Sequence, residues 1–153
     1  MRNCCEMEHL AILDKKRKLL SKILSGEKTI ESRWYVSQKT PYQQIFQGER
    51  IYFKNSGDPV TMAADVEKVL YFDHLDEWKI RDILGEYGAR IGIPVEASNK
   101  LVGKNFCTLV FLKNIALVEP FEIDKSGFGM MTAWITVEKI EKLRKSIVAD
   151  INN

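Results

Sequence analysis

The sequence of 153 residues is poor in the side chains on which metal and disulfide chemistry depend. It holds two histidines and three cysteines, and no two cysteines have the C-x-x-C spacing. Cys4 and Cys5 are adjacent, which suits a disulfide poorly, and Cys107 lies in an apolar run, where it is expected as a small core residue. We therefore predict no structural metal, no disulfide framework and a reducing, cytoplasmic location.

Long apolar runs are also missing. No stretch approaches the roughly 18 apolar residues of a membrane span, and the first residues lack the apolar segment of a signal peptide. Hydrophobic residues make up 45% and charged residues 29% of the chain, which is typical of a globular protein. No GxGxxG, P-loop or HExxH pattern occurs, so no cofactor is predicted. At this length one domain, residues 1–153, can bury its own core.

Charge is nearly balanced over the chain but not along it. The net charge of +2 is too small to indicate a nucleic-acid-binding protein by itself. Residues 1–40 carry nine basic and five acidic side chains, whereas residues 65–77 carry five acids and one lysine. An anionic partner should therefore meet the first third of the chain.

Helix and strand patterns alternate along the chain. Runs rich in β-branched and aromatic residues predict strands at residues 9–13, 28–36, 51–54, 60–72, 106–112 and 115–118, the last two as two strands or one bent strand. Amphipathic patterns predict helices at residues 15–25, 76–85 and about 137–151. Trp78 and Trp134 lie on apolar stripes and are expected in the core. This order predicts an α+β fold with a mainly antiparallel sheet.

The densest polar cluster follows Gly26, where the first predicted helix ends and a strand begins. Alternate residues of a strand share a face, so Glu31 and Arg33 should point the same way, with Thr29 and Tyr35. An acid, a guanidinium, a hydroxyl and an aromatic ring on one face could grip a nucleotide. The alternative is an exposed ion pair between Glu31 and Arg33 on a barrel wall, worth under about 1 kcal/mol.

The segment Gly26-Glu27-Lys28-Thr29-Ile30-Glu31-Ser32-Arg33 resembles the GxKxxExR signature of the ASCH domain, a branch of the PUA-like superfamily. Residues 48–53 are similar to the family's G(D/E)xIxF strand, and the similarity in element order covers roughly residues 9–145. The resemblance implies a PUA-like, mainly antiparallel β-barrel flanked by helices. It also implies a cleft beside the signature that receives RNA or a nucleotide derivative.

Carried over to this chain, the resemblance places Lys28, Glu31 and Arg33 in that cleft. We add as candidate contacts the neighbouring or nearby residues Thr29, Trp34, Tyr35 and Lys54. The predicted partner is single-stranded RNA or a modified nucleoside or nucleotide, without membrane contact.

Two other functions stay open. Some small bacterial members of the family remove the acetyl group from N4-acetylcytidine with a lysine, a threonine and a glutamate, and related proteins have been proposed to cut single-stranded RNA. Here Lys28 matches the lysine, Glu31 stands in the threonine's place, and the glutamate could be Glu77 or Glu86. A hydrolase would use Lys28 and Glu31 as its catalytic groups. ASCH domains also occur within transcriptional coactivators, so the third reading is a protein-interaction module.

Overall fold

A computed structural model describes residues 6–146 of the chain. Its elements are β1 (Glu8–Leu13), a 3-10 turn (Lys15–Arg17), α1 (Leu19–Ser25), β2 (Ile30–Tyr35), β3 (Arg50–Asn55), β4 (Val60–Phe72), α2 (Glu77–Ile91), a 3-10 segment (Val95–Leu101), β5 (Phe106–Phe121), β6 (Trp134–Val137) and a 3-10 turn (Ile140–Leu143). The strands of this part of the chain form one sheet in the order β2-β5-β4-β3-β1-β6. Neighbouring strands are antiparallel except β1 and β3, which are parallel, so the predicted α+β fold is confirmed.

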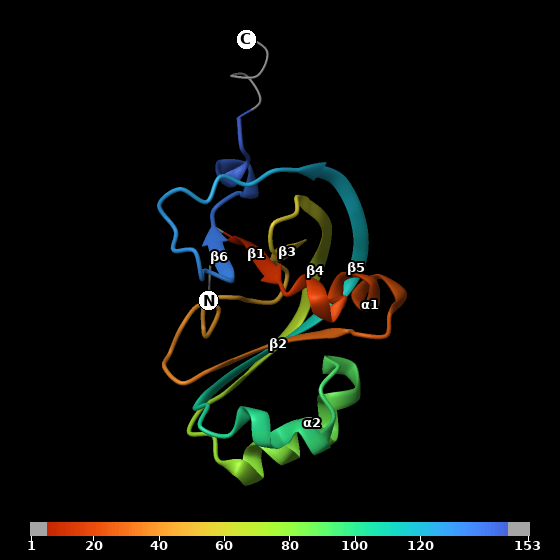
Figure 1. Cartoon of the computed structure of the whole chain (residues 1–153), viewed down its shortest axis with the longest axis vertical. Coiled ribbons are helices and arrows are strands. Elements are labelled where there is room, and N and C mark those ends of the chain that lie inside the picture. The colour runs from red at the N-terminus through yellow and green to blue at the C-terminus, as the bar shows by residue number, and fades with distance from the viewer. Residues whose placement is uncertain (1–5, 147–153) are drawn as a thin grey trace.

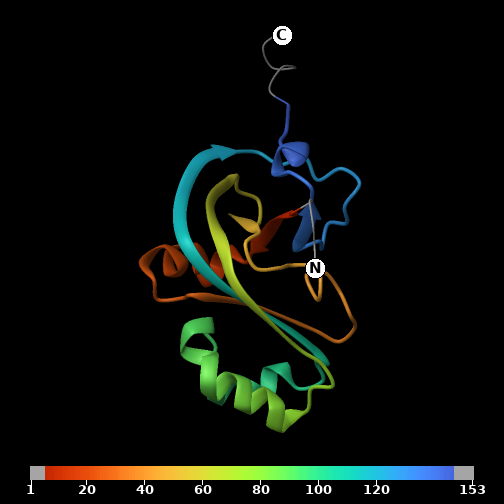
Figure 2. The same ribbon diagram turned by 180° about the vertical axis from the view of Figure 1, so that it is seen from behind.

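The sheet bends into a half-barrel because its two longest strands curve. Figures 1 and 2 show β4 and β5 running side by side in one arc, with α1 beside them and α2 under the lower end of the sheet. The pairing of β4 with β5 shifts register at three places, and bulges of this kind bend and twist a strand. The two apolar runs after residue 105 are therefore a single bent strand.

Alternation along the strands places separate apolar clusters on the two faces of the sheet. On one face, Phe53 and Val110 pack with Ile23 of α1. On the other face, Leu109 packs with Ile80 of α2. None of the helices within residues 6–146 is long and apolar enough to cross a membrane.

A C-terminal helix was predicted at residues 137–151, and for residues 137–146 this prediction is wrong. Strand β6 pairs with β1 and ends at Val137, and a 3-10 turn follows; residues 147–151 lie outside the described part of the chain. Ile135 and Ile140 pack with Leu10 against the sheet. The Glu8 carboxylate accepts the Ile140 N–H at 2.7 Å, which fixes the turn to β1.

Trp78 was expected in the core and is 76% exposed, whereas Trp134 is buried as predicted. The reason lies in α2, whose buried face carries Ile80 and Leu84, so that Trp78 points outward. This helix also runs past the predicted residue 85 to Ile91.

The C-terminal end of α2 packs closely on the residues after it. A Cβ atom on Gly88 would lie 2.5 Å from the Ile93 carbonyl oxygen, while a Cβ on Gly85 would have no atom within 4 Å. The missing side chain at Gly88 therefore lets the chain turn back across the helix.

We predict opposite effects of alanine at these two glycines. Gly85→Ala should raise the free energy of unfolding by up to about 1 kcal/mol, because alanine has the higher helix propensity. Gly88→Ala should lower it by about 1–3 kcal/mol, because the added methyl group overlaps the Ile93 carbonyl. Urea unfolding measures both. A stabilising Gly88→Ala variant would contradict the close contact.

Candidate functional site

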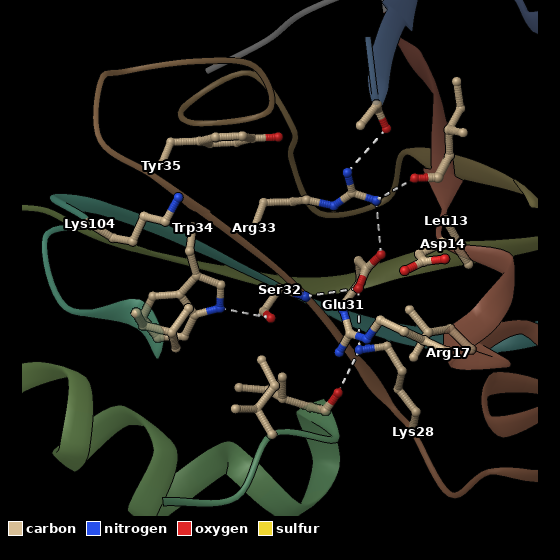
Figure 3. A pocket seen from close by; sticks show the side chains of 16 residues that line it. Leu13, Asp14, Arg17, Lys28, Glu31, Ser32, Arg33, Trp34, Tyr35 and Lys104 are labelled. Atoms are coloured by element: carbon tan, nitrogen blue, oxygen red, sulfur yellow. Dashed lines mark hydrogen bonds and ion pairs between the residues drawn. The ribbon is translucent and has the colours of Figure 1, made fainter. Parts of the chain in front are cut away.

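A cavity of about 470 Å³ opens beside β2, at the place where the sequence resembles the ASCH signature (Figure 3). Strand β2 is an edge strand, paired with β5 only, so one side of it is left to line a hollow. The charged residues that line this cleft are Asp14, Arg17, Lys28, Glu31, Arg33 and Lys104.

Lys28 is buried and surrounded by oxygen atoms. Its Nζ donates to the Ile30 carbonyl at 2.8 Å and to the Ile91 carbonyl at 2.6 Å, and it lies 3.2 Å from Glu31 Oε1. The three N–H bonds of an ammonium group thus meet three acceptors. Because Ile91 ends α2, Lys28 also places a positive charge at the negative end of that helix and ties it to β2.

Glu31 lies between two cations. Its Oε2 accepts a hydrogen bond from Arg33 Nη2 at 3.1 Å. Its Oε1 accepts a hydrogen bond from the Ser32 backbone N–H at 3.1 Å and also forms the ion pair with Lys28. Its side chain is 4% exposed. The interpretation as an exposed, inert ion pair is therefore wrong.

Arg33 joins β2 to the opposite side of the half-barrel. Nη1 donates to the Ala133 carbonyl at 3.1 Å, and Nη2 donates to the Ile12 carbonyl at 3.3 Å. The guanidinium carbon lies 5.1 Å from the centre of the Trp134 ring, a cation–π contact. Since β2 and β6 are the two edges of the sheet, Arg33 spans the opening between them.

Burial and neighbouring charges move the pKa values of this group. Burial lowers the pKa of Lys28, and this effect outweighs the attraction of Glu31, which raises it. Burial alone would raise the pKa of Glu31, but Lys28 and Arg33 together bring it below the ordinary value of 4.5. Glu31 is therefore an ionised carboxylate at neutral pH.

Most of the predicted contact residues meet in the cleft. Lys28, Glu31, Arg33, Trp34 and Tyr35 all line it. The alternation predicted for β2 holds only in part. Ile30 and Trp34 belong to the apolar cluster on α2, but Ser32 and Trp34, which have the opposite parity to Glu31 and Arg33, also line the cleft.

Thr29, Lys54, Glu77 and Glu86 belong to the described residues but do not line this cavity. Thr29 precedes β2, and its hydroxyl accepts from Arg90 Nε at 2.8 Å.

Lys54 lies at the end of β3, on the face opposite to Phe53, and is 7% exposed. Burial lowers its pKa, and Lys125 adds to this effect. Glu77 and Glu86 lie on the exposed side of α2. The structure thus separates these four residues from the cleft.

Sequence reasoning missed four polar residues of the cleft: Asp14, Arg17, Ser32 and Lys104. Asp14 caps the 3-10 turn that follows it, and its carboxylate accepts the Lys16 N–H at 3.0 Å. Arg17 lies in the segment 15–25 that was predicted as an amphipathic helix, where no pattern singles it out. Lys104 is far from β2 in sequence, and no local pattern marks it.

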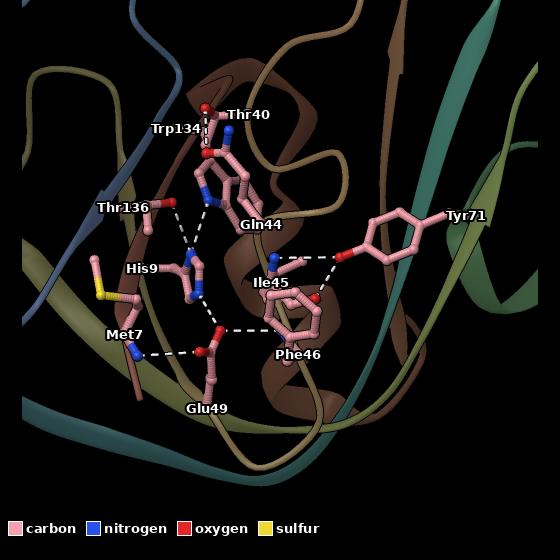
Figure 4. A network of polar contacts seen from close by, with 10 residues as sticks. All are labelled: Met7, His9, Thr40, Gln44, Ile45, Phe46, Glu49, Tyr71, Trp134 and Thr136. Atoms are coloured by element: carbon pink, nitrogen blue, oxygen red, sulfur yellow. Dashed lines mark hydrogen bonds and ion pairs between the residues drawn. The ribbon is translucent and has the colours of Figure 1, made fainter. Parts of the chain in front are cut away.

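A second polar network lies behind Trp134 (Figure 4). His9 is fully buried; its Nε2 lies 2.8 Å from Glu49 Oε1, and its Nδ1 lies 3.2 Å from Trp134 Nε1 and 3.0 Å from Thr136 Oγ1. Because an indole N–H only donates, Nδ1 accepts and Nε2 carries the proton toward Glu49. The Trp134 ring, which contacts the Arg33 guanidinium, is therefore also fixed by its hydrogen bond to His9 of β1.

Within residues 6–146 no group of three His, Cys, Asp or Glu side chains is arranged to hold a metal ion. The cleft is lined instead by basic side chains, by the two acidic side chains of Asp14 and Glu31, and by the aromatic rings of Trp34 and Tyr35. Such a set suits a ligand that combines hydrogen-bond donors, a flat ring and negative charge.

Neither the protein-family models nor the curated proteins yield a match to the sequence. Solved structures do match. The ASCH protein from Zymomonas mobilis has a TM-score of 0.64 at 17% identity, over 91% of this chain and 96% of that chain. A variant of it with tyrosine replaced by phenylalanine has a TM-score of 0.63 at 17% identity, over 90% of this chain and 99% of that one. A serine-to-alanine variant of the same protein has a TM-score of 0.63 at 18% identity, over 88% of this chain and 92% of that one.

The chain therefore has the fold of the ASCH proteins. The resemblance drawn from residues 26–33 is confirmed at the level of the fold, and the described structure is a half-barrel of mixed strands flanked by helices.

Glu31→Gln should reduce stability at neutral pH and have little effect in acid. Because the folded-state pKa of Glu31 lies below 4.5, the unfolded chain takes up the proton first as the pH falls. The stabilisation by ionised Glu31 is present above about pH 4.5 and is lost as the pH falls through the folded-state pKa. Urea unfolding between about pH 7 and pH 3 should therefore show a shrinking difference between wild type and variant.

The matched control is Glu67→Gln, which makes the same change at an exposed position of β4. It should leave the free energy of unfolding nearly unchanged. A Glu31→Gln effect that stays constant with pH, or that equals the effect at Glu67, would contradict the buried ionic cluster.

Proposed function

We propose that the chain is an ASCH-type module that binds RNA or a modified nucleoside in the cleft beside β2. The observation that carries the proposal is the convergence of Lys28, Glu31 and Arg33 on one cavity of about 470 Å³. That volume falls in the range of roughly 300–1,000 Å³ found for small-ligand sites. The fold shared with the ASCH proteins supports it.

Glu31 is the group best placed to recognise a base. An ionised carboxylate oxygen accepts about two hydrogen bonds, and Oε2 accepts one from Arg33 Nη2. The remaining lone pair would accept from an exocyclic amino group. Lys28 and Arg33 hold the carboxylate in place and keep it ionised, so their part is positioning.

Rings and cations around Glu31 would hold the rest of a nucleotide. Figure 3 shows the Tyr35 ring and the Lys104 amine on one side of the cleft and Arg17 on the other. Aromatic side chains stack on bases, and basic side chains bind phosphate. The cleft therefore has a group for each part of a nucleotide.

One observation favours a hydrolase as the second candidate. A buried lysine whose pKa is lowered, next to an ionised carboxylate, is an arrangement that enzymes use for proton transfer. To touch a substrate, however, Lys28 would have to release one of its three acceptors. Incubation with N4-acetylcytidine and with labelled single-stranded RNA separates the two functions. Turnover that Glu31→Gln abolishes would favour the hydrolase, and binding without product would favour the module.

A protein-interaction module would require a large exposed apolar patch away from the cleft. Met130 and Met131 are 96% and 92% exposed in the loop before β6. Met131 also lines a cavity that shares Tyr35 with the cleft. This patch thus borders the cleft, and the nucleotide site remains the better supported function.

Lys104→Ala should weaken the binding of a short fluorescent single-stranded RNA about tenfold. A hydrogen bond to a charged group is worth about 1.5–3 kcal/mol, and about 1.4 kcal/mol corresponds to a factor of ten. Titration at low and rising salt measures it, and affinity should fall with salt. Lys104 is half-buried in the cleft wall.

Lys113→Ala is the control, because it removes one exposed lysine from β5 outside the cleft lining. It should bind as the wild type does. No RNA or nucleoside binding at low salt, or an equal loss in both variants, would reject the proposal.

A further inference from the structure

The cleft continues into a hollow at each end. A cavity of about 410 Å³ shares Tyr35 and Ala133 with it, and a cavity of about 330 Å³ shares Arg17, Ile93 and Leu101. Shared walls make the three cavities neighbours, with the cleft in the middle. A free nucleoside would fill the middle cavity and leave both ends empty.

Each outer cavity adds positive charge. Lys39 lines the cavity beyond Tyr35, and Lys100 lines the one beyond Leu101, together with Arg17. No acidic residue is among the lining residues of either outer cavity in the described part of the chain. A neutral nucleoside gives these cations nothing to bind, whereas a phosphodiester chain carries one negative charge per link.

Tyr35 stands between two of the hollows. It lines both the cleft and the cavity that holds Lys39, and Lys39 Nζ lies 5.6 Å from the centre of its ring. In Figure 3 the ring extends from β2 next to the Lys104 side chain. The half-buried Tyr35 ring therefore lines two cavities that each hold a lysine, Lys104 in one and Lys39 in the other. Grooves that bind single strands combine such rings, on which successive bases stack, with basic side chains that bind the phosphates.

We propose that the cleft and its two neighbours form one site for a single-stranded polynucleotide of at least three nucleotides, one in each cavity. Tyr35 stacks between the central base and the base beyond it. Lys39 binds phosphate at that end, and Arg17 and Lys100 bind phosphate at the other. The inference rests on the proposed function and names its ligand as a chain, not a free nucleoside.

The test compares ligand lengths. Affinities of adenylate, cytidylate and uridylate are measured as mononucleotide, trinucleotide and hexanucleotide, by competition against a fluorescent hexanucleotide at low salt. We expect at least one trinucleotide to bind ten or more times as tightly as its mononucleotide, and its hexanucleotide to add less than a further factor of about three.

Variants in the two outer cavities show where the higher affinity of the trinucleotide arises. Lys39→Ala and Lys100→Ala should each weaken the trinucleotide several-fold, leave the mononucleotide unchanged, and reduce the slope of log K against log salt by about 0.7, the value for one phosphate contact of a single strand. Lys113→Ala, exposed on β5, should change neither affinity nor slope.

The outcomes separate this inference from the proposed function. Mononucleotides that bind as tightly as hexanucleotides, or a Lys113→Ala variant that loses as much as the other two, would overturn the inference and leave the nucleotide cleft standing. Absence of binding by every ligand would overturn both. A hexadeoxynucleotide that binds equally well supports a polynucleotide site that does not read the 2′-hydroxyl.

Discussion

Two buried charges and one largely buried charge on and next to β2 are the constraint on which the rest of the structure depends. The side chains of Lys28, Glu31 and Arg33 are 3%, 4% and 12% exposed. Charges so deeply buried are tolerated only when they are paired and hydrogen-bonded. Lys28 finds its acceptors at the end of α2, and Arg33 finds them on β1 and before β6. The cluster therefore joins four parts of the chain, and the hollow between them has Glu31 in its wall.

The same contacts link the two edges of the half-barrel at its opening. Its two edge strands, β2 and β6, do not pair, and Arg33 bridges them through the Ala133 carbonyl and the Trp134 ring. His9 and Glu49 hold Trp134 from behind. The Arg33 guanidinium thus lies between the two edge strands, next to the buried carboxylate of Glu31.

Local patterns were enough for β1 to β5, but not for β6, and they placed Lys28, Glu31 and Arg33 in one segment. The predicted strands at residues 51–54 and 60–72 are present as β3 and β4, and the alternation along β2 placed Glu31 and Arg33 on one face. Both features depend on neighbours in sequence. The resemblance to the ASCH signature then named a fold that the solved structures support.

Features that depend on distant contacts could not be predicted in this way. Residues 137–146 have a helical pattern, but pairing of β6 with β1 extends to Val137, and the Glu8 carboxylate holds the short turn that follows. Lys104 and Arg17 enter the cleft only because the chain returns there after α2 and after β1. Thr29 and Lys54 carry polar groups that could bind a nucleotide, but neither lines the cleft. The Thr29 hydroxyl accepts from Arg90, and Lys54 lies at the end of β3.

The central claim is that the hollow beside β2 receives a nucleotide, and backbone amide chemical-shift mapping with a short single-stranded RNA tests it most directly. The account predicts that the largest shifts fall on Arg17, Ser32, Tyr35 and Lys104, which all line the cleft. Shifts gathered on another face, such as the exposed side of α2 around Trp78, or no shifts at low salt, would contradict it.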